Sequence, residues 1–177
     1  MKNTNQSLFD KYEMIKDLGT GSSGSVTLVR HISMDQERAL KKVPKASAFA
    51  ESALSEARLL KSLEHPSIPR IFDFEEDNAF YYIVEEYIDG ETLDSFLLHQ
   101  QLISPGLFFN ICEQLCNVFI YLHTQISTPI IYRDLKPEHI IVCHNKLKLI
   151  DFGVSAYVIQ DGNNFNRYGN CLLYTSD

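Results

Sequence analysis

Apolar and polar residues tend to alternate between Tyr12 and Lys45, and two turn-like segments interrupt the alternation. The first interruption is rich in glycine, and the second reads HISMDQE. Because successive side chains of a β-strand point to opposite faces of the sheet, this pattern predicts three short antiparallel strands. The segments IPRIFDFEED and AFYYIVEEY predict two more strands, joined by an acidic turn.

Two segments have helical spacing instead. The apolar residues of ESALSEARLLKSLE fall on one helical face, so this segment predicts an amphipathic helix. A longer helix is expected from Ser104 to Gln125, because Ser104 can cap its first turn and Pro105 stands where no amide partner is needed. The predicted apolar faces are Ala53, Leu54, Ala57, Leu60 and Leu63 in the first helix, and Leu107, Phe108, Ile111, Leu115, Val118, Phe119 and Leu122 in the second.

Three short strand patterns follow the long helix. They read PIIY, HIIVC and KLKLI, and a tight turn near His144 and Asn145 joins the last two. The order of elements therefore predicts a first lobe of five strands and one helix. A second part begins with the long helix, and no further helical pattern follows that would complete a second lobe.

Composition narrows the class of protein without identifying it. The chain has 177 residues, 45% of them hydrophobic, which is enough to bury a sizeable core. A formal net charge of −7 argues against nucleic acid or an anionic membrane as the main partner. No apolar run approaches the roughly 20 residues of a membrane span, and the polar start does not resemble a secretory signal. Unevenly spaced cysteines without a CxxC pair fit a cytoplasmic location.

A glycine-rich segment, LGTGSSGSV, runs from Leu18 to Val26 with the spacing GxGxxGxV. Glycines allow a phosphate to approach the backbone because no Cβ stands in the way. Such a match on its own is often an ordinary loop. A dinucleotide-binding fold would need a helix after the glycines, but SVTLVRH alternates like a strand. The segment therefore favours a hairpin folded over a nucleotide.

A lysine in RALKKV is the second candidate. Ala39 and Lys41 share one face of the predicted strand, while Lys42 points to the opposite face. A small residue beside a lysine leaves room for a flat base while the ammonium reaches its phosphates. Glu56, in the predicted helix, is the candidate ion-pair partner of Lys41. Taken alone, a solvated strand lysine and a surface acid would be the favoured interpretation of these two residues.

Two aspartates in YRDLKPEHIIVCHNKLKLIDFG form the third candidate. Asp134 and Asp151 each follow a predicted strand, and a hairpin separates them, so both carboxylates can converge on one cleft. One carboxylate could accept a proton from a hydroxyl, and the other could hold a divalent cation that bridges phosphates. Two acids at strand ends can also be ordinary turn residues.

The chain resembles the eukaryotic-type serine/threonine protein kinases, and in particular the bacterial members of that family. The resemblance rests on the order of five features: the glycine segment, the lysine strand, the helix glutamate, RDLKPE and DFG. The resemblance covers Tyr12 to about Val158. It implies an α+β, two-lobe protein-kinase fold that binds ATP and magnesium and phosphorylates Ser or Thr of protein substrates. The ATP-binding residues that it implies are Leu18, Gly19, Thr20, Gly21, Ser22, Ser23, Gly24, Ser25, Val26, Ala39, Lys41, Ile141 and the hinge residues from Glu86 to Ile88.

The resemblance also implies catalytic roles. Lys41 would contact phosphates and pair with Glu56, Asp134 would orient or deprotonate the substrate hydroxyl, and Asp151 would bind magnesium. Lys136 resembles the lysine of serine/threonine kinases. Regulatory roles are implied for Arg133, through a phosphorylated activation loop, and for Phe152 and Gly153 of DFG. Leu60, Ile71, Tyr132 and Phe152 match the stacked residues of active kinases.

Three positions depart from the family pattern. Tyr132 replaces the commoner histidine, and the acidic Glu85 stands where an apolar residue or threonine is usual. His139 replaces the asparagine that binds a second magnesium, so the metal ligands implied here are Asp151 and His139. Since manganese accepts nitrogen more readily than magnesium does, activity is expected to be reduced with Mg²⁺ and relatively better with Mn²⁺.

Two alternatives to an active protein kinase share its fold. A pseudokinase, which holds a nucleotide or a partner without catalysis, would explain His139 and Glu85. A small-molecule kinase such as an aminoglycoside phosphotransferase would share the fold, but such relatives usually lack the Lys-Pro-Glu run and DFG.

The expected organisation is a polar tail (1–11), an N-lobe with hinge (12–88) and the first part of a C-lobe (89–170). The last residues, CLLYTSD, match the translation of a transposase end used as a sequencing adapter, so 171–177 are expected to be a read-through tail. The missing APE-like motif predicts a truncated domain with little activity of its own. Any membrane anchor would lie beyond the truncation.

Overall fold

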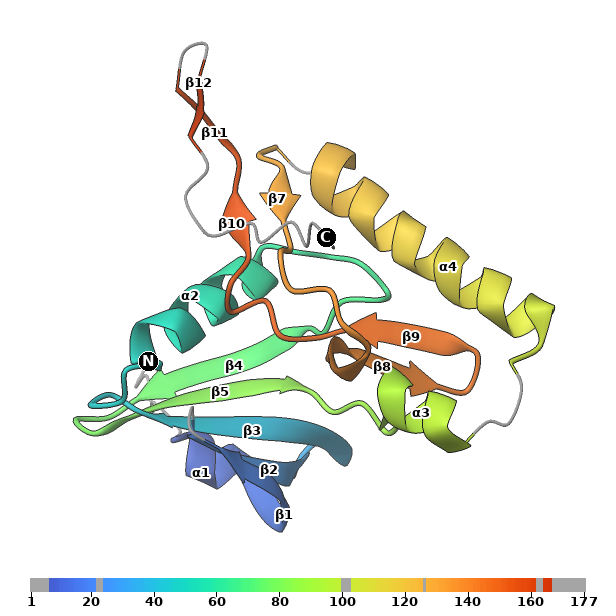
Figure 1. Cartoon of the computed structure of the whole chain (residues 1–177). Helices are drawn as coiled ribbons and strands as arrows, with labels where there is room; N and C mark the ends of the chain where they lie inside the picture. The colour runs from blue at the N-terminus through green and yellow to red at the C-terminus, as the bar shows by residue number, and fades with distance from the viewer. Residues whose placement is uncertain (1–6, 22–23, 100–102, 126, 162–163, 167–177) are drawn as a thin grey trace. The chain divides into compact units, whose positions relative to one another are not determined.

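A computed structural model describes residues 7–21, 24–99, 103–125, 127–161 and 164–166 of the chain (Figure 1). The chain divides into two compact units, one of residues 1–64 and 69–89, the other of residues 65–68 and 90–177. Ser22 and Ser23 of the glycine segment and the expected read-through tail, 171–177, lie outside the described residues.

The first unit is built on a five-stranded antiparallel sheet with the strand order β1-β2-β3-β5-β4. The sheet confirms the five strands predicted from alternation. Its members are β1 (Tyr12–Gly21), β2 (Gly24–His31), β3 (Gln36–Pro44), β4 (Ile71–Glu76) and β5 (Phe80–Glu86).

The helix α2 (Ala50–Lys61) packs on this sheet through the apolar face that its spacing predicts (Figure 1). Ala53 and Ala57 form one buried cluster with Val43 of β3 and Ile83 of β5. Leu60 is also buried, whereas Leu54 is only half-buried and Leu59 is buried in addition. Because alanine side chains are small, the helix can lie close to the sheet at this contact.

The expected polar tail is shorter than predicted, because Leu8–Lys11 form a short helix, α1. Leu8 is fully buried in a second cluster of the sheet, with Tyr12, Val29 and Leu40 among its members. The sequence did not predict this contact, because Leu8 and Phe9 are the only large apolar residues between Met1 and Tyr12.

The helices of the second unit are α3 (Leu93–His99) and α4 (Pro105–Ile120), and a π-helical turn (Tyr121–Gln125) continues α4. Ser104 caps α4 as predicted, since its side chain accepts a hydrogen bond from Leu107 N at 3.2 Å. The sequence pattern did not predict α3 as a separate helix. Among the described residues, no helix is long and apolar enough to cross a membrane.

The strands of the second unit are short. The sheet β6-β8-β9 contains the predicted hairpin, and β7 pairs with β10. The bounds are β6 (Glu91–Thr92), β7 (Ile130–Ile131), β8 (Ile140–Cys143), β9 (Lys146–Leu149), β10 (Ala156–Tyr157), β11 (Ile159–Asp161) and β12 (Asn164–Asn166), with a three-residue 3₁₀ turn at Pro137–His139. The turn between β8 and β9 uses His144 in the left-handed region, with φ 56°.

Residues 65–68 were expected in the N-lobe but belong to the second unit. Leu149 N of β9 donates a hydrogen bond to Ser67 O at 2.8 Å, and Lys148 Nζ donates to Ile68 O at 3.4 Å. These bonds use main-chain carbonyls, which carry no sequence signal. The segment between α2 and β4 is therefore part of the second unit, although it lies between two elements of the first.

Asp77 organises the acidic turn between β4 and β5. Its Oδ1 accepts hydrogen bonds from Ala79 N and Phe80 N, both at 2.7 Å, and its Oδ2 accepts one from Tyr82 Oη at 2.9 Å. The two backbone hydrogen bonds, with the tyrosine as a smaller contribution, hold the pKa of the Asp77 carboxyl below its ordinary value. A carboxyl with a depressed pKa stabilises the fold above its unfolded pKa, about 3.9, and this contribution is lost as the pH falls through the folded pKa.

We therefore expect Asp77→Asn to lower the melting temperature at pH 7 and to reduce the further loss of stability below about pH 4. The exposed Asp35, on the turn between β2 and β3, provides the matched control. Thermal unfolding of wild type, Asp77→Asn and Asp35→Asn at pH 7 and at pH 3.5 tests this. Equal melting curves for the two variants at both pH values would contradict the role of Asp77.

Candidate active site

The glycine segment forms the tip of the hairpin between β1 and β2, where Gly21 pairs with Gly24 and Gly19 pairs with Val26. Gly24 has φ 139°, and a Cβ built on it would lie 2.1 Å from the carbonyl oxygen of Lys42. Only glycine fits there. Gly19 and Gly21 differ, because a Cβ on either would meet nothing within 4 Å. Their backbone is open to a ligand, while Gly24 is required by the hairpin itself.

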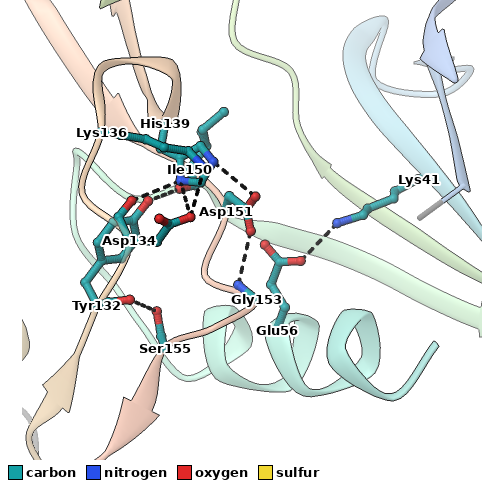
Figure 2. A network of polar contacts seen from close by, with 10 residues as sticks. All are labelled: Lys41, Glu56, Tyr132, Asp134, Lys136, His139, Ile150, Asp151, Gly153 and Ser155. Carbon is teal, nitrogen blue, oxygen red and sulfur yellow. Dashed lines mark hydrogen bonds and ion pairs between the residues drawn. The ribbon is translucent and has the colours of Figure 1, made fainter. Parts of the chain in front are cut away.

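Lys41 and Glu56 lie in contact, with 2.9 Å between Lys41 Nζ and Glu56 Oε2 (Figure 2). The ammonium comes from β3 and the carboxylate from the middle of α2, so the packing of α2 on the sheet sets the contact. Both side chains are largely buried, 22% and 11% exposed, which strengthens their attraction relative to a surface pair. Lys42 points to the other face of the strand, where its Nζ lies 4.0 Å from the centroid of the Phe80 ring.

Further candidate residues of the first unit lie along β3 and β5. Ala39 is buried, and its partner across the sheet is Glu85, so the two side chains share one face. Glu86 closes β5: its N–H donates to Arg70 O at 2.9 Å and its Oε2 accepts from Arg70 N at 3.3 Å. Ile88, two residues on, is half-buried, as is Val26 on β2.

In the second unit, Asp134 and Asp151 follow short strands, as the sequence predicts, but the left-handed backbone at Arg133 and Asp151 was not foreseen. Asp151 has φ 61° and Arg133, immediately before Asp134, has φ 70°. Residues other than glycine rarely occupy this left-handed region, and such conformations are concentrated at functional sites. Lys136 Nζ lies 3.1 Å from Asp134 Oδ2, which places a positive charge beside this carboxylate.

His139 stands between the two aspartates (Figure 2). Its Nδ1 lies 3.1 Å from the main-chain oxygen of Asp134 and 3.4 Å from Oδ2 of the same residue. Its Nε2 lies 3.3 Å from Asp151 Oδ2. The imidazole is 11% exposed, while the carboxylates of Asp134 and Asp151 are 40% and 54% exposed. A buried ring therefore links two acids that solvent and ligands can reach.

Tyr132 braces the same region through its hydroxyl, which donates a hydrogen bond to the main-chain oxygen of Ile150. Its ring contacts Phe152 edge-on at 5.0 Å between centroids, and its own carbonyl accepts from Ser155 Oγ at 3.2 Å. Gly153 N donates to Asp151 Oδ1 at 3.3 Å. The sequence did not point to Ile150 or Ser155. Their hydrogen bonds with Tyr132 each use a main-chain oxygen as the acceptor, and a main-chain oxygen carries no sequence signal. Ile141, on β8, is half-buried.

Comparison with known proteins identifies the family. The family model described as a protein kinase domain matches residues 12–176. The chain belongs to the protein kinase family. The protein-kinase fold expected from the order of its motifs is thereby confirmed.

Three relatives illustrate the range of similarity. The chain is 31% identical over 151 residues to serine/threonine-protein kinase PrkC of Bacillus subtilis, covering 82% of this chain and 23% of PrkC. It is 35% identical over 172 residues to calcium-dependent protein kinase 4 of Plasmodium falciparum, covering 89% of this chain and 31% of that kinase. It is 31% identical over 159 residues to serine/threonine-protein kinase pkn2 of Myxococcus xanthus, covering 85% of this chain and 19% of pkn2. The chain spans less than a third of the length of each of these three relatives.

The family implies ATP and a divalent cation, and the donor groups present fit both. The open backbone at Gly19 and Gly21 and the ammonium of Lys41 suit phosphates, and the exposed carboxylate of Asp151 suits a hard cation. Within the described ranges, no three His, Cys, Asp or Glu side chains are grouped so that they could hold a metal ion alone. This agrees with the way magnesium is usually bound, through one or two carboxylates completed by phosphate and water oxygens.

Proposed function

We propose that this chain carries the catalytic residues of an ATP-dependent serine/threonine protein kinase, which transfers the γ-phosphate of ATP to a hydroxyl of a protein substrate. The observation that carries the proposal is the arrangement of Asp134 and Asp151, whose carboxylates both lie within 3.4 Å of the imidazole of His139. Two ligand-accessible acids beside the same imidazole can take different roles in one reaction, a base for the hydroxyl and a ligand for a cation.

The proposed roles divide between ATP binding and phosphate transfer. The backbone of the glycine segment and Lys41 bind the phosphates of ATP, and Glu56 holds Lys41 in position. The main chain from Glu86 to Ile88 binds the base, with Val26, Ala39 and Ile141 as its apolar contacts. Asp134 accepts the hydroxyl proton, and Lys136, 3.1 Å from it, neutralises charge on the transferring phosphate. Asp151 and His139 hold a divalent cation, which supplies further neutralisation of phosphate charge when bound.

Four further residues are proposed to determine the acceptor class and the regulation of the kinase. Lys136, two residues after Asp134, supports Ser and Thr as acceptors rather than Tyr. Arg133, Phe152 and Gly153 are the proposed regulatory residues: Arg133 for a phosphorylated loop, and Phe152 with Gly153 for the placement of Asp151. A cytoplasmic location, expected from the cysteine pattern, stays a prediction.

A pseudokinase is the second candidate, and one observation favours it. Both ring nitrogens of His139 lie close to carboxylate oxygens, so a ring that carried hydrogens on both nitrogens would neutralise Asp134 and Asp151 together. In that state Asp151 would be bonded to protein rather than to a cation. The chain would then bind a nucleotide, or a partner, without catalysis.

The deciding experiment is a phosphate-transfer assay on the full natural protein that contains this sequence, with ATP and either Mg²⁺ or Mn²⁺. We expect autophosphorylation on Ser or Thr that Lys41→Ala and Asp134→Ala reduce strongly, the latter by about 10²–10⁴-fold, the usual contribution of a positioned base. Lys42→Ala is the matched control, since Lys42 lies next to Lys41 but on the opposite face of β3. It should retain activity.

Three results would change the conclusion. Nucleotide binding without transfer in either metal would favour the pseudokinase, and recovery of transfer in His139→Asn would place the defect at that residue. Transfer that survives both Lys41→Ala and Asp134→Ala would rule out the proposed roles of these two residues. Phosphotyrosine as the main product would rule out the proposed acceptor class.

A further inference from the structure

Lys11 connects the two edges of the sheet in the first unit. The strand order β1-β2-β3-β5-β4 places β1 at one edge and β4 at the other. Lys11 directly precedes β1, yet its Nζ lies 2.8 Å from Oδ2 of Asp73 and 3.9 Å from Oε1 of Glu75, both on β4. Neighbouring strands lie about 4.8 Å apart, so the edges of a flat five-stranded sheet would be about 19 Å apart. A lysine side chain cannot reach that far, so the sheet curls until its edges approach each other.

The helix α1 fills the face around which the sheet curls. Leu8 is fully buried in one cluster with residues of four strands, namely Tyr12 of β1, Val29 of β2, Leu40 of β3, and Tyr82 and Val84 of β5. Asp73 pairs with Val84 across the sheet, so the ion pair with Lys11 lies on this same face. The strands therefore curl around α1, and Lys11 holds the two edges together.

The opposite face of the same strands carries the residues proposed to bind ATP. Because side chains alternate along a strand, Leu40 points toward α1 while its neighbours Ala39 and Lys41 point to the face on which α2 packs. Val26 pairs with Lys41, so its side chain shares that face. The main chain proposed to bind the base begins at Glu86, the last residue of β5. A change in the curl would shift these groups relative to one another.

We propose that α1 is a strap that sets the curl of the sheet, and that Leu8 and Lys11 are positioning residues for ATP binding on the opposite face. The inference rests on the proposed function for the place of ATP, and it adds two residues that do not contact the nucleotide. Detachment of α1 would expose Leu8 and separate Lys11 from Asp73, and the sheet would then flatten. Because coupling between two sites is reciprocal, a bound nucleotide must also stabilise the attachment of α1.

Leu8→Ala in the full natural protein that contains this sequence provides the first test. We expect the KM and the Kd for ATP to rise about fivefold, the lower end of typical coupling between two sites, and kcat to change less than the KM. Ile32→Ala is the matched control, since this aliphatic side chain of the first unit is 59% exposed. The control keeps the main-chain bond from Ile32 N to Lys11 O and should retain the wild-type values.

A charge-reversal cycle tests Lys11 without any loss of apolar packing. Lys11→Glu places a third acid beside Asp73 and Glu75, and it should raise the Kd for ATP as Leu8→Ala does. Asp73→Lys, which brings two ammonium groups together, should have the same effect. The double variant Lys11→Glu/Asp73→Lys restores a pair of opposite charges and should recover the affinity. A double variant as impaired as the single variants would overturn the role of Lys11.

Hydrogen exchange of the Ile32 amide, which donates to Lys11 O at 2.9 Å, gives the reciprocal readout. We expect ADP to slow this exchange in the wild type, and to slow it less in Leu8→Ala. If Leu8→Ala melted earlier but bound ATP as tightly as the wild type, the inference would be wrong and α1 would have a structural role only. ATP binding that depends on Leu8 without phosphate transfer would overturn the proposed function and leave this inference standing. Transfer at an unchanged KM in Leu8→Ala and Lys11→Glu would do the reverse.

Discussion

Replacing Asp151 by Asn is expected to reduce phosphate transfer by about 10²–10³-fold, the range found when one preorganised electrostatic group is removed from an active site. The amide lacks the negative charge that holds a cation. The substitution also places a neutral amide beside Nε2 of His139, which lies 3.3 Å from the present Oδ2.

The substitution should leave the fold intact, because asparagine tolerates the left-handed backbone that Asp151 adopts at φ 61°. Asp35→Asn is the matched control: Asp35 is also left-handed, with φ 49°, and lies on an exposed turn of the first unit. Initial rates of transfer at saturating ATP, together with thermal melting curves, compare the two variants. If Asp151→Asn kept more than about a tenth of the wild-type rate, the proposed electrostatic role of Asp151 would be wrong.

The sheet of the first unit could be predicted from the sequence because apolar and polar residues tend to alternate along its strands. Both faces of the sheet carry an apolar cluster: Leu40, Tyr82 and Val84 point to one face, and Val43 and Ile83 point to the face on which α2 packs. Elements held by few side chains could not be predicted in this way. The helix α1 depends on the burial of Leu8 in an otherwise polar segment, and residues 65–68 are held by main-chain bonds to β9.

In the candidate site, likewise, some contacts could be predicted from the sequence and others could not. The contact between Lys41 and Glu56 was foreseeable, since strand periodicity puts Ala39 and Lys41 on one face and helical periodicity places Glu56 beside the apolar face of α2. The two contacts of His139 with Asp134 and Asp151 were not. They depend on loop conformations, with φ 70° at Arg133 and φ 61° at Asp151, that no local pattern of residue types specifies.

Gly24→Ala is expected to destabilise the first unit more than any other single glycine substitution in its sheet. A backbone with φ 139° is accessible almost only to glycine and costs other residues about 1–3 kcal/mol. The added Cβ would also lie 2.1 Å from Lys42 O and 3.2 Å from Val43 Cα, both backbone atoms of β3. Because neither neighbour is the end of a flexible side chain, β2 and β3 must separate locally.

Separation of these strands should also weaken nucleotide binding, because Lys42 directly follows Lys41 on β3 and Val26 pairs with Lys41 across the sheet. Gly19→Ala is the matched control, since a Cβ there meets nothing within 4 Å. It should be neutral or stabilise by about 0.4–1 kcal/mol, through the reduced entropy of the unfolded chain. Urea unfolding of both variants tests the difference in stability, and ATP titration of Gly24→Ala beside the wild type tests nucleotide binding. Equal stabilities would show that the hairpin tip can rearrange around a Cβ, and that Gly24 is not required by the fold.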